Sequence, residues 1–463
     1  MAELLEALRR AVGDDAVLAG EAAAEAAYSP WTRLGTPLAV LRPRTTADVA
    51  AILRLAHASG TPVVPWGGRT GLVDGCFADG ALALSLSRMT AVETLDAATG
   101  VMRVQAGCTV QAACEAAEAA DLLLPLDLGS RGSATIGGTL STNAGGNRVV
   151  RFGMMRDMVL GVEAVLADGT VVEALNPLIK NNTGYDLKQL FIGSEGTLGV
   201  VTRAVLRLRP RPTSHNVAFL AVDDFAALGR LLRRLERSLG GRMSAFEVMW
   251  PGYYALVTRP PARGTAPLPD GHRFYVLTEA MGGDREADDA AFERALVSAL
   301  EDGDIVDAVV AKSDAERAAL WALRDDVGQT SRDGPILAFD VSLRIADMPA
   351  YLDDVRAGLP PTPGGGARRM VVFGHLGDGN LHLIVSLDDR TPDHVHAVEA
   401  AVYAPLRGRG GSVSAEHGVG LTKRDYLAWS RTDAEIAAMR AIKAALDPTG
   451  ILNPGKVLKP ALP

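Results

Sequence analysis

The sequence has few of the residues that mark several large classes of protein. Its 463 residues include only 3 cysteines, Cys76, Cys108 and Cys114, which form neither a CxxC pair nor an even set. A disulfide framework is therefore not expected, and the cysteines suit a reducing cytoplasm. No apolar run approaches the roughly 18 residues that a membrane-spanning helix needs. The opening MAELLEALRRAVGDD predicts an amphipathic surface helix rather than a signal peptide. We therefore expect a cytoplasmic protein without a transmembrane segment.

The usual sequence motifs for nucleotide binding are also absent. Neither GxGxxG nor GxxxxGK[ST] occurs, so a Rossmann fingerprint and a Walker loop are both excluded. The formal net charge of −8 and the isoelectric point near 5.6 argue against a nucleic-acid partner. The length of 463 residues exceeds one ordinary core and predicts two or three domains.

The pattern of strands and turns changes near residue 211. Before it, short strand-like runs alternate with glycine-rich turns, and 161–175 predicts a hairpin that turns at Asp168-Gly169. These strands are too closely spaced for repeated βαβ units, so the fold class is α+β. Near the end of the chain, Thr432 and Glu435 have the spacing of a capping box and predict the start of a helix.

Three long glycine-rich segments occupy the first half, at 65–75, 127–153 and 181–200. Clustered glycines let the backbone approach a ligand closely and direct successive N–H groups at anionic oxygens. One such cluster is more often a set of turns between strands. Three of them in one half favour a site for a diphosphate or another large polar ligand.

In this order, the three segments resemble the flavin-binding domain of the vanillyl-alcohol oxidase / p-cresol methylhydroxylase superfamily. The resemblance implies a two-part FAD-binding domain over 1–210. Because no histidine lies between His57 and His215, it implies non-covalent FAD. The residues that the resemblance assigns to FAD are Pro65, Gly67, Gly68, Arg69, Thr70, Gly71, Leu72, Ser133, Thr135, Gly137, Gly138, Ser141, Asn143, Gly145, Gly146, Glu195, Gly196, Gly199, Val200 and, near the end of the chain, Asn453.

Two of the chain's 8 histidines flank a tight turn in VVFGHLGDGNLHLIV (371–385). A hairpin bent at Gly-Asp-Gly-Asn would place His375 and His382 side by side on one face. A divalent metal needs at least a third ligand, and Glu416 stands beside His417 in a glycine-rich stretch further along. A lone histidine is more often a hydrogen-bonded structural residue, but a His2Glu set is typical of a catalytic zinc site.

Both stretches resemble the C-terminal motifs of the FAD-linked D-2-hydroxyacid dehydrogenases, and the ending LDPTGILNPGKVL (446–458) matches that group as well. The group includes D-lactate dehydrogenases, the glycolate oxidase flavin subunit and D-2-hydroxyglutarate dehydrogenase. The resemblance implies a substrate and metal domain over 211–425, with an antiparallel sheet, and a helical segment over 426–463 that packs back on the FAD domain. It implies that a D-2-hydroxy acid is oxidised to a 2-oxo acid, with hydride passing to the flavin.

The same resemblance gives a role to each of the polar residues in these motifs. His375, His382 and Glu416 would hold the metal, His417 would accept the hydroxyl proton, and Asn380 would contact the substrate. An alcohol is too weak an acid to ionise at neutral pH, and a divalent metal lowers the pKa of bound water from about 16 toward 7. Zinc is expected first because it is redox-inert, with manganese or cobalt as alternatives.

The substrate carboxylate needs a cation, and Arg324 in LWALR (320–324) offers a guanidinium fork that suits it. The resemblance supports Arg324 over a surface ion pair. Related D-2-hydroxyglutarate dehydrogenases tend to carry a threonine and a lysine where this chain has Gly328 and Ala338. A second carboxylate would need another partner, such as Arg344, so D-2-hydroxyglutarate, D-lactate, D-malate and bulkier D-2-hydroxy acids all remain open.

Other functions are compatible with parts of the sequence. A non-haem iron oxygenase could use the same His2Glu set, but it would leave the glycine-rich half without a role. A flavin-dependent transferase of the same superfamily would need no external acceptor, and a nucleotide-binding module would need no catalytic residues. The sequence does not choose between oxygen, a quinone, a cytochrome and an electron-transfer flavoprotein as electron acceptor, and it leaves a homodimer open.

Overall fold

The computed structural model describes residues 1–460, which form two compact units. The first unit contains 1–146, 153–211 and the described chain from 416 to 460, and the second contains Asn147–Phe152 and Pro212–Ala415. The division at Arg211 lies beside the expected boundary. The structure differs from the expected division in two places, because 147–152 belong with the second unit and the chain rejoins the first unit at Glu416 rather than at 426. Among the described residues, no helix is long and apolar enough to cross a membrane.

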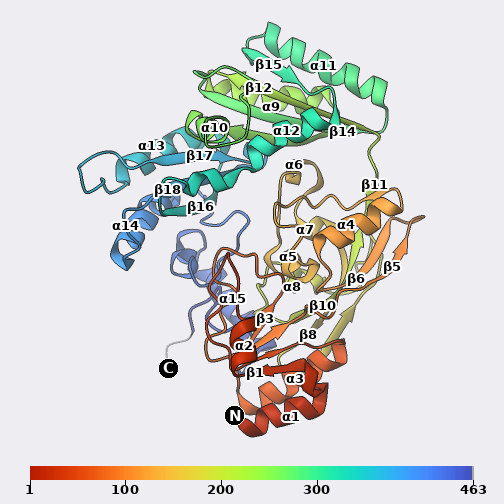
Figure 1. The fold of residues 1–463 in the computed structure, drawn as a ribbon. Helices are drawn as coiled ribbons and strands as arrows, with labels where there is room; N and C mark the ends of the chain where they lie inside the picture. The colour runs from red at the N-terminus through yellow and green to blue at the C-terminus, as the bar shows by residue number, and fades with distance from the viewer. Residues whose placement is uncertain (461–463) are drawn as a thin grey trace. The chain divides into compact units, whose positions relative to one another are not determined.

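The first unit contains a small four-stranded sheet in the order β1-β2-β4-β3. Strands β1 and β3 of this sheet are labelled in Figure 1. Strand β1 pairs antiparallel with β2, whereas β2, β4 and β3 are parallel. The expected N-terminal helix is present as α1, and a capping box at Thr45 begins α3. The elements are α1 (Ala2–Val12), β1 (Val17–Ala19), α2 (Glu21–Ala26), β2 (Ala39–Leu41), α3 (Thr46–Ser59), β3 (Val63–Trp66) and β4 (Leu82–Ser85).

The second sheet of this unit is five-stranded and antiparallel, in the order β5-β6-β10-β8-β9. The expected hairpin is confirmed as β8 and β9, and Gly169 at its turn has φ 83°. The elements are β5 (Val92–Asp96), β6 (Val101–Gln105), α4 (Val110–Ala119), β7 (Leu122–Leu123), α5 (Ile136–Thr142), α7 (Met155–Met158), β8 (Val159–Val165), β9 (Val171–Ala174), α8 (Lys188–Phe191), β10 (Val200–Arg207) and β11 (Arg209–Pro210).

The C-terminal part of the first unit contains α15 (Asp433–Leu446). The expected capping box is confirmed, because the Thr432 hydroxyl accepts from the Glu435 N–H and the Glu435 carboxylate accepts from the Thr432 N–H. Lys443 donates to the Thr197 carbonyl (2.7 Å), and Val63 forms an isolated bridge with Leu452. These bonds attach the end of the chain to the glycine-rich half.

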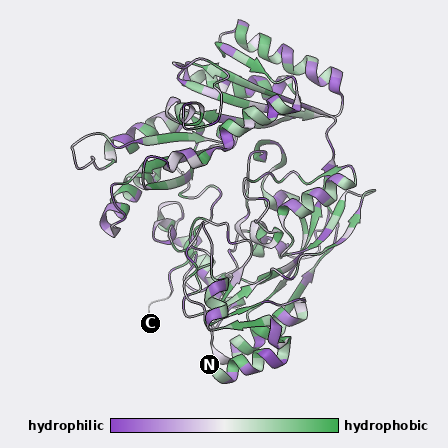
Figure 2. Cartoon of the chain, viewed as in Figure 1, coloured by the Kyte–Doolittle hydropathy of each residue, from purple (hydrophilic) through white to green (hydrophobic). Residues whose placement is uncertain are grey.

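The second unit is built on a seven-stranded antiparallel sheet in the order β15-β12-β14-β13-β17-β18-β16. All of these strands except β13 are labelled in Figure 1. Its strands are coloured mostly as hydrophobic in Figure 2. Helices α10 and α12 supply buried residues to the core on one face of the sheet. The elements are α6 (Val149–Phe152), β12 (Ser214–Val222), α9 (Phe225–Ser238), β13 (Met243–Met249), α10 (Pro251–Thr258), β14 (Phe274–Gly282), α11 (Arg285–Glu301), β15 (Asp307–Val310), α12 (Asp314–Asp325), β16 (Ile336–Ser342), α13 (Met348–Gly358), β17 (Met370–Gly374), β18 (Asn380–Ser386) and α14 (Pro392–Tyr403).

Candidate functional site

The expected histidine hairpin is confirmed as β17 and β18, joined by a short turn at Leu376–Asp378. Phe373 lies opposite His382 across the pair. Side chains two residues apart on a strand share a face, so His375, just past the end of β17, projects to the same side as His382. The two imidazole centroids are 5.2 Å apart. Gly379, with φ 84°, closes the turn in a conformation that favours glycine.

Glu416 joins these two histidines. One ligand atom from each of His375, His382 and Glu416 lies within 4.8 Å of the other two. The chain path explains this proximity, because Glu416 follows Ala415, whose N–H donates to the Asp340 carboxylate (3.0 Å). Asp340 in turn lies opposite His382 in the β16–β18 pair. Two imidazoles and one carboxylate within this spacing fit a divalent cation that retains an open coordination position.

Glu247 on β13 contacts His375 through the imidazole nitrogen Nδ1. Its side chain is 1% exposed, and its Oε1 lies 2.7 Å from Nδ1 of His375. Burial alone would raise the pKa of Glu247, but its contacts with His375 and Arg324 outweigh burial and hold that pKa below its usual value. An ionised carboxylate only accepts hydrogen bonds. Nδ1 of His375 therefore carries a proton, and Nε2, which lies beside Arg324 Nη2 in this structure, is the nitrogen whose lone pair a metal would take.

Arg324 lies at the end of α12, in contact with the same carboxylate. Its Nε donates to Glu247 Oε2 (2.6 Å), its Nη2 lies 3.2 Å from Nε2 of His375, and its guanidinium stands 5.0 Å from the Phe373 ring centre. Burial would lower the pKa of Arg324, but the Glu247 charge raises it above its usual value. Within the described chain, Nη1 makes no hydrogen bond. The sequence prediction placed Arg324 on a helix beside the site, and the structure brings it there.

Asn380 is the clearest sign of a missing ligand in this region. It is 3% exposed, and neither its amide nitrogen nor its amide oxygen has a hydrogen-bond partner in the described structure. Its backbone N–H donates to the His375 carbonyl (3.2 Å), which fixes it beside the cluster. A buried amide without partners is costly, so a bound polar molecule is expected there.

The structure shows no comparable arrangement for a second substrate carboxylate at Arg344, Gly328 or Ala338. Arg344 is 78% exposed at its side chain and forms an ion pair with Asp347. Gly328 lies in a 3-10 turn with open space where a side chain would begin. Ala338 on β16 is exposed and lies opposite Ile384. The structure therefore gives Arg344 a surface partner of its own and places no cation at 328 or 338.

The three glycine-rich segments pack directly on one another in the first unit. A Cβ on Gly68 would lie 2.0 Å from the Ser133 carbonyl oxygen, and one on Gly67 would lie 2.6 Å from Thr135 Oγ1. The Glu195 N–H donates to the Ser141 carbonyl (2.8 Å), which ties the third segment to the second. Such close backbone approach requires glycine, as expected of a loop that wraps a cofactor.

Asn453 lies where these segments meet. Its Nδ2 donates to the carbonyls of Gly75 (3.1 Å) and Glu195 (2.7 Å), while its buried Oδ1 has no partner in the described structure. Asn453, Arg69, Asn143 and Glu195 all have positive φ values, of 41°, 56°, 50° and 52°. Backbone strain of this kind concentrates at ligand sites, so the geometry fits the FAD that these residues were expected to hold. Among the other expected FAD residues, Val200 is buried in β10, whereas Leu72 is 46% exposed.

The stretch that carries His417 is held by Glu195. The Glu195 carboxylate accepts the N–H groups of Val419 (2.6 Å) and Gly420 (2.8 Å). Burial raises the pKa of Glu195, against the lowering effect of these two N–H groups. His417 itself is half-buried next to Glu416. Glu195 was expected to contact FAD, and the structure gives it a backbone clamp next to the expected proton acceptor.

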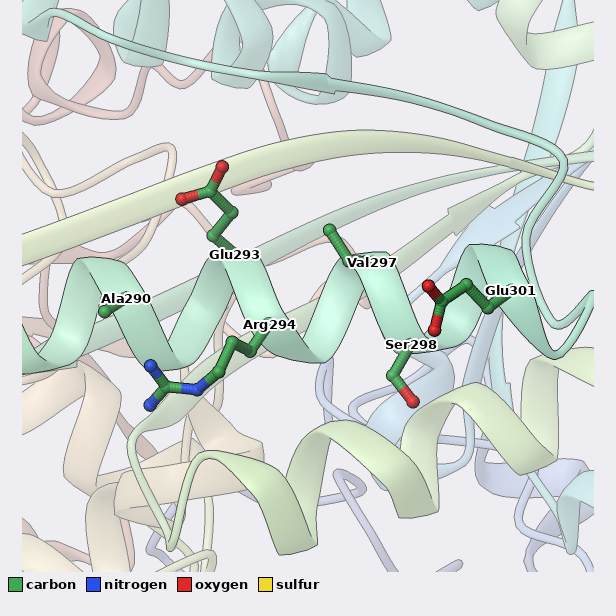
Figure 3. Close-up of a pocket in the computed structure, with 6 residues that line it drawn as sticks. All are labelled: Ala290, Glu293, Arg294, Val297, Ser298 and Glu301. Atoms are coloured by element: carbon green, nitrogen blue, oxygen red, sulfur yellow. The ribbon is translucent and has the colours of Figure 1, made fainter.

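Glu247 is the site residue that sequence reasoning missed. The sequence could have indicated Glu247 as a candidate site residue, because it is the single charged residue of the apolar strand MSAFEVM (243–249). Glu279 and Asp340 interrupt β14 and β16 in the same way. Two hollows of the described surface are lined by residues other than those of the site. The pocket in Figure 3 is lined by six residues of α11, and another is lined by residues of α9, four of them arginines, together with Asp302 and Asp304.

Comparison with known protein families gives two matches. Residues 211–457 match the C-terminal domain of FAD linked oxidases, and residues 37–175 match an FAD binding domain. The first match starts where the second unit resumes after β11.

Individual relatives extend these matches to most of the chain. The sequence is 42% identical to the mitochondrial D-2-hydroxyglutarate dehydrogenase of Bos taurus, over 92% of this chain and 78% of that protein. It is 41% identical to a D-2-hydroxyglutarate dehydrogenase of Xanthomonas citri pv. viticola, over 93% of this chain and 91% of that protein. The fold resembles that of p-cresol methylhydroxylase, with a TM-score of 0.78 and 17% identity over 99% of this chain and 97% of that chain. It also resembles alkyldihydroxyacetonephosphate synthase, with a TM-score of 0.75 and 17% identity over 98% of this chain and 86% of that chain.

Proposed function

The chain belongs to the FAD-linked D-2-hydroxyacid dehydrogenases of the vanillyl-alcohol oxidase / p-cresol methylhydroxylase superfamily, and on this basis we propose its metal and its substrate. The protein is an FAD-dependent enzyme that oxidises a D-2-hydroxy acid. The further proposal is that a divalent cation, with zinc as first choice and manganese or cobalt as alternatives, binds His375, His382 and Glu416. The observation that carries it is the clustering of their ligand atoms within 4.8 Å.

Each polar residue of the site has a separate task in this proposal. Bound FAD supplies the hydride acceptor, and the cation supplies Lewis acidity at the substrate hydroxyl. Arg324 binds the substrate carboxylate through its free Nη1 edge, with Nε held by Glu247. Asn380 provides the amide that has no protein partner in the described structure. His417 accepts the hydroxyl proton at an imidazole nitrogen.

D-2-hydroxyglutarate is the first substrate candidate, because the relatives in Bos taurus and Xanthomonas citri are named for it. D-Lactate and D-malate are the comparison substrates, since no cation lies at 328 or 338 and Arg344 pairs with Asp347. We propose a cytoplasmic location because the chain has only 3 cysteines, which form no disulfide framework. The likeness to alkyldihydroxyacetonephosphate synthase concerns the fold and adds no support for a transferase reaction.

A panel of D- and L-2-hydroxy acids tests this function. Reduction of an artificial dye is measured with purified protein, before and after treatment with a chelator and again after Zn2+ is restored. We expect turnover of one or more D acids, little turnover of the L forms, loss of the rate with chelator and recovery with Zn2+. A rate that the chelator leaves unchanged would remove the metal from the mechanism. Activity restricted to L acids would contradict the assigned substrate class.

A further inference from the structure

One buried carboxylate, that of Glu247, touches two residues of the site at once. It has one oxygen on His375 Nδ1 (2.7 Å) and the other on Arg324 Nε (2.6 Å). The first contact concerns a proposed metal ligand, and the second concerns the proposed substrate-carboxylate ligand. Arg324 and His375 also contact each other directly, with Nη2 3.2 Å from Nε2, so the carboxylate and these two side chains form one hydrogen-bonded group.

We propose that Glu247 is a positioning residue that prepares the site for both the metal and the substrate carboxylate. This inference rests on the proposed function. By accepting from Nδ1, Glu247 keeps the proton on that nitrogen and directs the lone pair of Nε2 toward the position of the cation. By accepting from Nε, it fixes the rotation of the guanidinium about its long side chain, with Nη2 beside His375 and Nη1 left for the substrate.

The strand pairing makes Glu247 suitable for this position. Val248 lies opposite Gly374 in the β13–β17 pair, so Glu247 lies at the level of His375 on the adjacent strand. Leu277 is its partner on the other side, from β14. Tyr253 donates its hydroxyl to the Arg324 carbonyl (2.8 Å), which fixes the end of α12 over the same face. Backbone and side chain of Arg324 are therefore each held by a residue of the second unit.

Glu247→Gln tests the proposal because an amide has one acceptor oxygen for two donors. It can satisfy His375 or Arg324, but it then presents an N–H to the other. Glu279→Gln is the matched control. Glu279 is equally buried on the neighbouring strand β14, and it accepts from Arg148, His215, Ser244 and Trp321 rather than from a site residue. Both proteins are studied as FAD-loaded full chains, which are metal-stripped for the Zn2+ titration and Zn2+-restored for the kinetics.

We expect Glu247→Gln to weaken Zn2+ binding, measured by competition with a chromophoric chelator, by about 10- to 100-fold. The KM of the best D-2-hydroxy acid should also rise by about tenfold. Glu279→Gln should lower the melting temperature and change Zn2+ affinity by less than about twofold, within the usual scatter of such contributions. Glu247→Asp, which keeps a carboxylate with a shorter reach, should fall between wild type and Gln, and it carries the test if the Gln variant does not fold.

Unchanged Zn2+ affinity and unchanged KM in a folded Glu247 variant would overturn this inference, as would equal losses in the Glu279 control. These results are distinguishable from failure of the proposed function. A wild-type protein that binds no Zn2+ would refute the metal site itself. Normal Zn2+ binding by the wild type, with the same affinity and KM in the Glu247 variants, would refute only the positioning role.

Discussion

At the scale of single residues, the second unit buries three carboxylates on the strands of its sheet. Glu247, Glu279 and Asp340 are each no more than 1% exposed. A buried charge is costly unless it is paired and hydrogen-bonded, so each of them must have a reason to be there. Glu279 is satisfied by structural partners, Asp340 holds the backbone at Ala415, and Glu247 holds two residues of the site. The identity of the partner, rather than burial, separates the functional carboxylate from the structural ones.

His417→Ala tests the proton acceptor at the same scale. Loss of a general base should lower kcat by about two to four orders of magnitude, while FAD content stays at the wild-type level. His394→Ala is the control, because that imidazole lies on α14 and pairs with the carboxylates of Asp388 and Asp389 instead of a site residue. Turnover and the absorbance ratio of flavin to protein are measured for both variants. A His417→Ala protein that keeps wild-type turnover, or one that also loses FAD, would show that His417 has been misassigned.

At the scale of elements, the site depends on a short irregular segment, residues 416–423, rather than on a helix or strand. Glu195 accepts the N–H groups of Val419 and Gly420, the Leu421 N–H donates to the Val73 carbonyl (2.9 Å), and the Val457 N–H donates to the Gly420 carbonyl (3.1 Å). The segment is thus bonded to the first glycine-rich loop and to the end of the chain. Its position follows from contacts that are distant in sequence.

Gly420→Ala tests how tightly this segment is held. Gly420 has φ 51°, and a Cβ there would lie 2.0 Å from the Val73 carbonyl oxygen. Gly450→Ala is the matched control, since Gly450 has φ 68° but nothing within 4 Å of its Cβ position. Both should lose about 1–2 kcal/mol from the left-handed backbone, and Gly420→Ala should lose about 1–3 kcal/mol more from overpacking. Denaturant unfolding measures the free energy of unfolding of both variants. Equal losses would mean that residues 416–423 can shift to accommodate the added methyl group.

At the scale of the whole molecule, local signals in the sequence predicted local structure well. Gly-Asp-Gly-Asn between apolar runs predicted the β17–β18 hairpin, and Thr432 with Glu435 predicted the start of α15, because turns and caps depend on neighbouring residues. The family motifs predicted that His375, His382 and Glu416 share one site, and the ligand atoms of these residues do lie close together in the fold.

The features that sequence reasoning did not reach are non-local. Residues 147–152 join the second unit because Arg148 binds Glu279, which lies 131 positions later. Glu247 reaches His375 across the pairing of β13 with β17, and no pattern within either strand indicates that pairing. The packing of α15 is also non-local, because its start follows from the capping box whereas none of its residues is fully buried, and Ile442 is 37% exposed.

The proposed mechanism requires a cation held by His375, His382 and Glu416 before a D-2-hydroxy acid can reduce the flavin. A single-turnover experiment can follow the visible flavin band anaerobically, with metal-stripped and Zn2+-restored protein. We expect rapid bleaching by a D acid only in the restored protein, and none by its L isomer. Bleaching at the same rate in the stripped protein would contradict this mechanism.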